Sequence, residues 1–192
     1  MTVDGPEAPR KTFRPVRVAV ATLIGAWVVF LFLYRPRGPA NLDPPRLSPP
    51  FPVAKADVRW TLRNLDGSPK AFSDYQGHAV FLNIWATWCP PCRDELPAIA
   101  NLASNPRLKG VSFLCASVDE DLDTLRDFVK AKKLTVPVAR ATTLPEVFQS
   151  DGIPATFLIA PDGTIVASQI GAAQWDDPAV VDFLEQLAKR SP

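Results

Sequence analysis

Two cysteines, Cys89 and Cys92, lie between a segment with the pattern of a buried strand and a segment with helical spacing. The run 79–85 is short, aliphatic and aromatic, and follows a glycine turn, which is typical of a buried strand. Beyond Cys92, apolar residues recur with the spacing of a helix. The pair is therefore expected at the N-terminus of a helix, where the dipole and free N–H groups lower a cysteine pKa. A C-x-x-C in this setting predicts a dithiol/disulfide redox site.

Two other interpretations of the cysteine pair are weaker. A structural zinc site needs four ligands, and the chain offers only Cys115 and His78 besides the pair. These two residues lie far apart in the sequence and make a poor second half of such a site. A purely structural disulfide would close a very small loop and would constrain the unfolded chain little. Redox chemistry is the favoured interpretation.

Charge is unevenly distributed along the chain. Residues 1–52 hold seven Lys/Arg and three Asp/Glu, whereas residues 53–192 hold fourteen Lys/Arg and seventeen Asp/Glu. A mildly acidic globular part gives no reason to expect a nucleic-acid partner. The basic residues instead flank an apolar segment near the N-terminus.

That apolar segment, residues 18–34, has no charged residue over its whole length. It lies at the short end of the roughly 17–25 residues that span a bilayer as a helix. The alternative is a cleaved signal peptide, which would end at a small-x-small site; the one candidate is Gly38-Pro39-Ala40. An uncleaved transmembrane helix is favoured.

The expected organisation has four parts. Residues 1–17 form a short basic cytoplasmic tail, on a weak excess of Lys/Arg before the apolar segment. Residues 18–34 form one transmembrane helix, and residues 35–52, with seven prolines, form a stiff linker without packing. Residues 53–192 form the folded domain. The protein is then a single-pass cell-membrane protein whose domain faces the periplasmic, extracytoplasmic side, where disulfides form.

The folded domain alternates between strand and helix patterns. Strands are expected near residues 58–65, 79–85, 111–118, 136–141, 155–159 and 164–169, and helices near 92–105, 121–132, 144–148 and 178–189. This order predicts an α/β fold with a central mixed β-sheet flanked by helices on both faces.

The residues of this domain resemble a known family. From about residue 58 to residue 187 the chain is similar to the thioredoxin fold, and within it to the TlpA/ResA-like membrane-anchored thiol-disulfide oxidoreductases. The markers are Asp66-Gly67, Ser73-Asp74-Tyr75-Gln76-Gly77, Asn83-Ile84-Trp85-Ala86-Thr87-Trp88-Cys89-Pro90-Pro91-Cys92-Arg93-Asp94-Glu95-Leu96-Pro97, and Gly152-Ile153-Pro154-Ala155-Thr156-Phe157-Leu158-Ile159-Ala160-Pro161-Asp162-Gly163.

The resemblance implies a role for each residue of the site. Cys89 would be the exposed nucleophile and Cys92 the resolving thiol. Pro154 would be a cis-proline that faces the disulfide, since X–Pro bonds are the only common cis peptides. The alternative for Pro154 is a plain turn proline before a strand.

Glu95 is the candidate proton acceptor for Cys92, because it matches the acid of the family's Cys-x-x-Cys-x-x-Glu pattern. Asn83 stands where ordinary thioredoxins carry a buried acid, and a neutral amide cannot take a proton from the thiol. An equally open interpretation is that Glu95 only complements the helix dipole. Cys115 lies among apolar residues and is expected to be a buried free thiol.

The function implied by the resemblance is reduction of disulfides or CxxC motifs in client proteins, of the cytochrome c maturation or oxidase assembly type. An integral-membrane thiol reductase would supply the electrons, and a monomer without cofactor or metal is expected. Pro90 removes one N–H donor from the Cys89 thiolate, which favours the disulfide and so a reducing role. Two alternatives stay open. A peroxiredoxin-like thiol peroxidase needs a lone cysteine on its own strand-helix turn, and a thiol-based metal-delivery module would use the pair as ligands.

Overall fold

The computed structural model describes residues 23–25, 42–47 and 54–190. The chain divides into two units, Met1–Gly38 and Pro39–Pro192. In the first unit residues 23–25 are helical, and the rest of the expected membrane helix 18–34 lies outside the described residues. Among the helices that the structure describes, none is both long and apolar enough to cross a membrane. The expected tail, residues 1–17, also lies outside the described residues.

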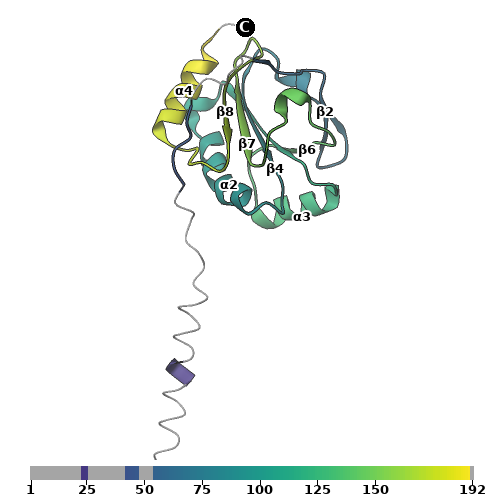
Figure 1. Cartoon of the computed structure of the whole chain (residues 1–192), viewed down its shortest axis with the longest axis vertical. Coiled ribbons are helices and arrows are strands. Elements are labelled where there is room, and N and C mark those ends of the chain that lie inside the picture. Colours follow the sequence, from purple (N-terminus) through teal and green to yellow (C-terminus); the bar gives the residue numbers. More distant parts are fainter. Residues whose placement is uncertain (1–22, 26–41, 48–53, 191–192) are drawn as a thin grey trace, which may run out of the picture. The chain divides into compact units, whose positions relative to one another are not determined.

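The second unit is built on one mixed eight-stranded sheet with the order β1-β8-β7-β4-β5-β6-β2-β3 (Figure 1). Its strands are β1 (Ala54–Lys55), β2 (Thr61–Asn64), β3 (Pro69–Ala71), β4 (Ala79–Trp85), β5 (Val111–Ser117), β6 (Val138–Arg140), β7 (Ala155–Ile159) and β8 (Thr164–Ile170). The predicted strand 79–85 is confirmed as β4, which is buried along its whole length. It pairs in parallel with β5 and antiparallel with β7.

The two sheet-edge strands β1 and β3 were not predicted from the sequence. β1 has only two residues, too few to show an alternating pattern. β3 begins at Pro69, and proline is normally a signal against a strand. Both strands lie at the ends of the sheet order, where a missing N–H donor is tolerated.

Three α-helices, α2 (Pro90–Ala103), α3 (Leu122–Lys132) and α4 (Pro178–Ala188), bury their apolar residues in the core on one face of the sheet. Residues from the opposite face of β4 pack instead with the 3-10 helices η1 (Phe72–Tyr75) and η3 (Glu146–Phe148). A third 3-10 helix, η2, spans Pro106–Leu108. Helices therefore flank both faces, but only short ones cover the second. The order β4-α2-β5-α3-β6 advances in one direction across the sheet, so right-handed crossovers place α2 and α3 on the same face.

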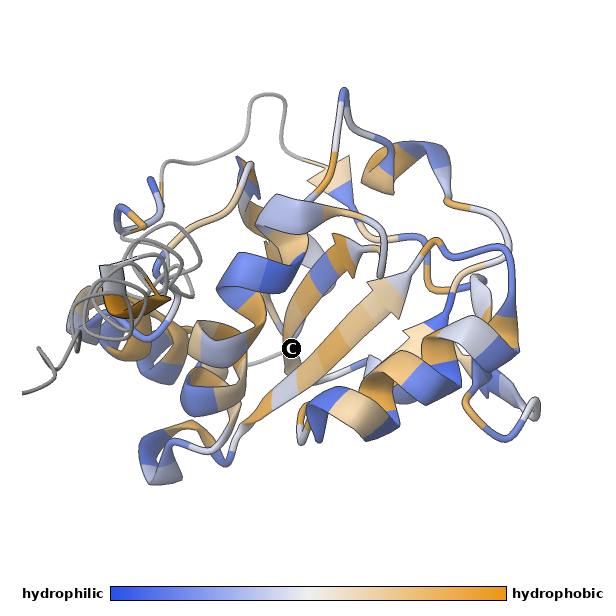
Figure 2. Cartoon of the chain, turned by 90° about the horizontal axis from the view of Figure 1, so that it is seen from below, coloured by the Kyte–Doolittle hydropathy of each residue, from blue (hydrophilic) through white to orange (hydrophobic). Residues whose placement is uncertain are grey.

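Hydropathy follows this layered arrangement (Figure 2). The strands are mostly apolar, whereas the α-helices alternate between apolar and polar residues along their length. α3 begins at the N-cap Asp121, whose carboxylate accepts the N–H groups of Asp123 and Thr124. α4 begins at Asp177 followed by Pro178, a residue that suits the first turn of a helix because its N–H would be unpaired anyway.

The expectation that the linker 35–52 lacks packing is wrong for residues 42–47. The carbonyl of Asp43 accepts the N–H of Gln174 at 2.9 Å, and the N–H of Arg46 donates to Gln169 Oε1 at 3.2 Å. Leu47 packs against the core beneath the helices. The burial of an apolar side chain and two hydrogen bonds made by backbone groups of the segment explain why this part lies on the domain. The remaining linker residues, 35–41 and 48–52, lie outside the described part of the chain.

Candidate active site

Cys89 and Cys92 form a disulfide at the start of α2, with their Cα atoms 5.3 Å apart. Cys89 is the N-cap of α2, and its Sγ accepts the backbone N–H of Cys92 at 3.3 Å. Pro90 and Pro91 occupy the first two helical positions and have no N–H to donate. The expected placement of the pair at the positive end of a helix is confirmed.

The two cysteines differ only slightly in exposure. Cys89 is 4% exposed and Cys92 is fully buried. The expectation of an exposed Cys89 is therefore too strong for the disulfide form, because the chain around α2 covers most of its surface. Trp88 is 65% exposed and gives this part of the surface an apolar side chain next to the disulfide.

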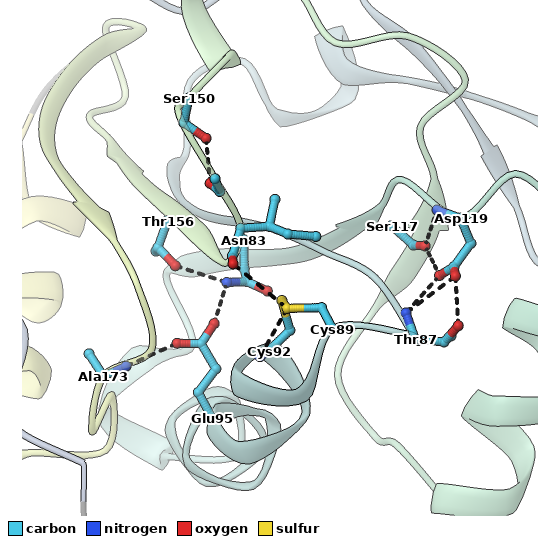
Figure 3. The surroundings of a disulfide bond; sticks show 12 residues. Asn83, Thr87, Cys89, Cys92, Glu95, Ser117, Asp119, Ser150, Thr156 and Ala173 are labelled. Carbon is cyan, nitrogen blue, oxygen red and sulfur yellow. Dashed lines mark hydrogen bonds between the residues drawn. A yellow bond between two sulfur atoms is a disulfide. The ribbon is translucent and has the colours of Figure 1, made fainter.

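The Ile153–Pro154 peptide bond is cis, as the resemblance implied. The carbonyl oxygen of Ile153 lies 3.7 Å from Cys89 Sγ, which brings the loop before β7 against the disulfide (Figure 3). No proton is available for a hydrogen bond between these atoms while the sulfur is part of a disulfide. A reduced Cys89 thiol could donate to this carbonyl.

Glu95 lies one helical turn beyond Cys92 and has no exposed surface. Its Oε1 accepts Asn83 Nδ2–H at 2.8 Å. Its Oε2 accepts the indole Nε1–H of Trp175 at 2.8 Å and the backbone N–H of Ala173 at 3.1 Å. The carboxylate is thus held between α2, β4 and the segment that joins β8 to α4.

Burial raises the pKa of the Glu95 carboxyl from its ordinary value to about 7. The hydrogen bonds from Trp175, Ala173 and Asn83 act in the opposite direction, since they stabilise the charged form. An acid whose pKa lies near neutrality can both take and return a proton under physiological conditions. This placement does not fit the interpretation of Glu95 as a solvated charge that only complements the helix dipole.

Asn83 joins the acid to the sheet. Its Nδ2 also donates to Thr156 Oγ1 at 2.9 Å, and both partners of Nδ2 are buried. Its Oδ1 is buried and has no hydrogen-bond partner among the residues that the structure describes. In Figure 3 this amide lies between the Glu95 carboxylate and the cysteine pair. The arrangement leaves an acceptor free on the side of the amide that faces the cysteines.

A second buried carboxylate, Asp119, was missed in the sequence. It is 3% exposed and accepts hydrogen bonds from Thr87, two residues before Cys89, and from Ser117 at the end of β5. No local pattern points to this contact, because Thr87 and Asp119 are 32 residues apart. The only available signal was topological: parallel strands β4 and β5 end at the same edge of the sheet.

Cys115 is fully buried in β5, directly across from Asn83 in the neighbouring strand β4. Burial raises the pKa of the Cys115 thiol, with the charge of Glu95 acting in the same direction. A thiol without surface and with a raised pKa is a poor nucleophile. Cys115 therefore does not offer the reactive site that a peroxidase would need. The described residues contain no group of three or more His, Cys, Asp or Glu side chains that could hold a metal ion.

The fold and the site together define a thiol-disulfide oxidoreductase with a thioredoxin-like fold. A thioredoxin-like sheet carries a reactive cysteine pair at a helix N-terminus, with a cis-proline loop against it and a buried acid beneath it.

Comparison with known proteins agrees with this class. Residues 53–168 match the model of the AhpC/TSA family. The chain is 33% identical over 121 residues to the thiol-disulfide oxidoreductase ResA of Bacillus cereus (strain ZK / E33L), a match that covers 62% of this chain and 70% of that protein. It is also 33% identical over 109 residues to ResA of Bacillus subtilis (strain 168), covering 56% and 61% of the two chains.

Among solved structures, a thiol:disulfide interchange protein of the thioredoxin family from Chlorobium tepidum TLS superposes with a TM-score of 0.54. The match has 25% sequence identity and covers 77% of this chain and 99% of that structure. The chain belongs to the AhpC/TSA family and is a thiol-disulfide oxidoreductase of the ResA type.

Proposed function

We propose that this protein is a membrane-anchored, extracytoplasmic reductase of disulfides in client proteins. The observation that carries the proposal is the Cys89–Cys92 disulfide at the N-terminus of α2 with the buried Glu95 one turn further on. A reducing direction is supported by the donors around Cys89. Its Sγ accepts the N–H of Cys92, whereas Pro90 and Pro91 offer none. Fewer donors stabilise the thiolate less, which favours the oxidised protein and the reduced client.

In the first step, the Cys89 thiolate attacks one sulfur of the client disulfide. A bond forms between Cys89 Sγ and that sulfur, and the other client sulfur leaves as a thiolate with the electron pair of the broken bond. The cis-Pro154 loop supports this assignment, since the Ile153 carbonyl lies beside Cys89 and proline adds no N–H or reactive side chain there. An extended client segment could pair with that backbone.

In the second step, Cys92 loses its proton and attacks Cys89 Sγ. The bond between Cys89 and the client breaks, the client sulfur leaves as a second thiolate, and the Cys89–Cys92 disulfide forms. Glu95 takes the proton of Cys92 and passes it to the departing thiolate or to water. This role is supported by its burial one helical turn beyond Cys92 and by a pKa of about 7.

The cellular setting is part of the proposal. The apolar segment 18–34 would be a single membrane span, with residues 1–17 in the cytoplasm and the domain in the periplasm or its equivalent. The clients would be proteins of cytochrome c maturation or oxidase assembly, an integral-membrane thiol reductase would return electrons to the Cys89–Cys92 disulfide, and the protein would act as a monomer. The ResA relatives support the chemistry of the reaction; the clients and the anchor are our proposal.

A trapping experiment tests the chemistry. Cys92→Ser keeps the attacking thiol and removes the resolving one, so the client should accumulate as a mixed disulfide with the full-length protein. The complex should separate on reduction, and mass spectrometry should identify the client and its bound cysteine. Cys89→Ser is the matched control and should trap nothing. Equal trapping by both variants would contradict the assigned roles.

The anchor is tested separately. The full-length protein should stay in the membrane fraction after high-salt and carbonate washes, with its N-terminus intact. A mature form that begins near Asn41 would show that the apolar segment is a cleaved signal instead.

A further inference from the structure

The turn that carries Cys89 is hydrogen-bonded to Asp119, a buried acid that has no part in the two steps above. Thr87, in that turn, donates its backbone N–H to Asp119 Oδ2 at 3.0 Å and its hydroxyl to Oδ1 at 2.6 Å. Figure 3 shows this contact on the opposite side of the cysteine pair from Glu95. Both oxygens of the carboxylate are therefore used by a single residue of the turn.

The other side of the carboxylate is fixed to the sheet. Ser117, the last residue of β5, donates its hydroxyl to Asp119 Oδ2 and accepts the N–H of Asp119 at 3.0 Å. All three residues are buried, with 8% exposure for Thr87, 3% for Asp119 and none for Ser117. Water cannot replace a hydrogen bond lost at such a site, so removal of one partner leaves the other unpaired.

The position of this turn sets the position of the Cys89 sulfur. The N–H of Cys89 bonds the carbonyl of Ala86 at 3.2 Å, so that Thr87 lies inside the same tight turn. Cys89 then caps α2, with its Sγ aimed at the N–H of Cys92. A turn that shifts relative to α2 would move Cys89 out of line with the helix N-terminus and with an incoming disulfide. Misplacement of a reacting group by about 1 Å can cost about 10²-fold in rate.

We propose that Asp119 is a positioning residue for Cys89. It does not touch the reacting sulfurs. It acts through Thr87: its carboxylate, carried on the chain that leaves β5, accepts the backbone N–H and the hydroxyl of that residue and so holds the turn after β4 in place. The inference rests on the proposed role of Cys89 as the attacking thiol.

The test isolates the first step in full-length protein that carries Cys92→Ser. The probe is 5,5′-dithiobis(2-nitrobenzoate), whose disulfide is attacked by the Cys89 thiolate; one thionitrobenzoate stays on Cys89 and the other leaves as a coloured thiolate. Thr87→Val removes the hydroxyl bond from the turn to Asp119 and should slow this reaction about three- to tenfold, a part of the loss expected for full misplacement. Thr87→Ser, which keeps the hydroxyl, should restore the rate.

Ser117→Ala is the matched control. It removes a buried hydroxyl bond to the same carboxylate but leaves both bonds from Thr87 in place, and Asp119 stays attached to β5 through the backbone, so the rate should stay within about twofold while the thermal midpoint falls as in Thr87→Val. A purely structural role predicts that both variants slow the reaction in proportion to their loss of stability. Asp119→Ala should slow it most; if that variant does not fold, the Thr87 and Ser117 pair still decides the question.

Two outcomes would overturn the inference: an unchanged rate in folded Thr87→Val, or equal slowing by Thr87→Val and Ser117→Ala. Failure of the proposed function gives a different result. In that case the Cys92→Ser parent would react slowly, or mass spectrometry would find the adduct on a cysteine other than Cys89.

Discussion

Two buried carboxylates lie on opposite sides of the cysteine pair, and they are built differently. Glu95 accepts three N–H groups, from Asn83, Ala173 and Trp175, of which only the Asn83 amide also carries an acceptor. Asp119 is bonded by the hydroxyls of Thr87 and Ser117 and by a backbone N–H of the turn. The first acid lies one helical turn beyond the resolving cysteine, whereas the second bonds the chain that carries the attacking one.

The difference shows that burial alone does not assign a role to an acid. Glu95 and Asp119 are both almost without exposed surface. Burial raises the pKa of Glu95 to about 7 in spite of its donors, which makes it suited to exchange a proton. The partners of Asp119 belong to two chain segments that must stay together, which makes it suited to hold a position.

The largest expected effect is on release of the mixed disulfide. Glu95→Gln should slow attack by Cys92 about 10- to 100-fold, somewhat less than the usual contribution of a general base because a thiol is partly ionised near neutral pH. The first attack by Cys89 should change little. Single-turnover kinetics with a disulfide substrate across pH separates the two steps, and in the parent protein release should follow a group with a pKa of about 7.

Asp94→Asn supplies the control for this variant, because Asp94 is an exposed acid in the same helical turn. It should leave both steps unchanged. If the two variants behave alike, or if Glu95→Gln alters neither step, Glu95 takes no part in the proton transfer and its hydrogen bonds serve the structure alone.

The second expected effect is on the pH dependence of stability. The pKa of Glu95 is raised in the folded protein, so the folded state holds this proton to higher pH than the unfolded chain does. Its contribution to the free energy of unfolding is therefore greatest below about pH 4.5 and falls by about 3 kcal/mol as the pH rises to about 7. Denaturant titrations of the full chain in detergent, compared with Glu95→Gln, isolate this contribution. A parallel pH profile for the two proteins would contradict it.

Replacement of the acid by its amide should therefore change the free energy of unfolding in opposite directions at Glu95 and at Asp119. At pH 8, Glu95→Gln removes a buried charge whose desolvation outweighs its hydrogen bonds, as the raised pKa of Glu95 indicates, and should raise the free energy of unfolding relative to the parent. Asp119→Asn should lower it by about 1–2 kcal/mol, because weaker bonds to a neutral amide replace the charge-assisted bonds from Thr87 and Ser117. Chemical denaturation of both variants at pH 8 provides the comparison, and a shift of the same sign in both would show that the two sites are equivalent.

The smallest expected effect comes from one donor to Glu95. Trp175→Phe removes the indole N–H that lowers the pKa of the acid, so this pKa should rise further and the release step should reach its plateau at higher pH. Trp60→Phe is a matched control on the other face of the sheet, where the indole N–H bonds the carbonyl of Thr143. If the pH profile of the release step shifts in Trp60→Phe, or does not shift in Trp175→Phe, the bond from Trp175 does not set the pKa of Glu95.

The sequence was informative wherever the signal was local. The strand before the cysteines, the helix after them and the turn at Gly163 each follow from a short pattern, and all are present in the structure. The cis bond at Pro154 was implied by the resemblance and is confirmed. Glu95 was named as a candidate, but its environment was not predictable, because Ala173 and Trp175 lie 78 and 80 residues away.

Features that depend on packing between distant segments were missed or misjudged. The Thr87–Asp119 contact forms because two parallel strands end side by side, which no single window of the sequence encodes. Residues 42–47 were expected to be free of the domain because prolines dominate the segment. Leu47 and two backbone hydrogen bonds instead join them to it. The proline content of a segment predicts its stiffness. It does not predict whether the folded domain offers a surface on which that segment can pack.

The contact between Trp175 and Glu95 also allows the ionisation of the buried acid to be followed by tryptophan fluorescence. The indole of Trp175 packs edge-on against Phe81, with ring centroids 5.0 Å apart, and its only polar group bonds the carboxylate. Indole emission responds to a charge at Nε1–H, so ionisation of Glu95 should alter the ultraviolet fluorescence of this tryptophan. The difference spectrum between the parent and Trp175→Phe, followed across pH and across reduction of the disulfide, would then record the charge of Glu95 in real time and without a label.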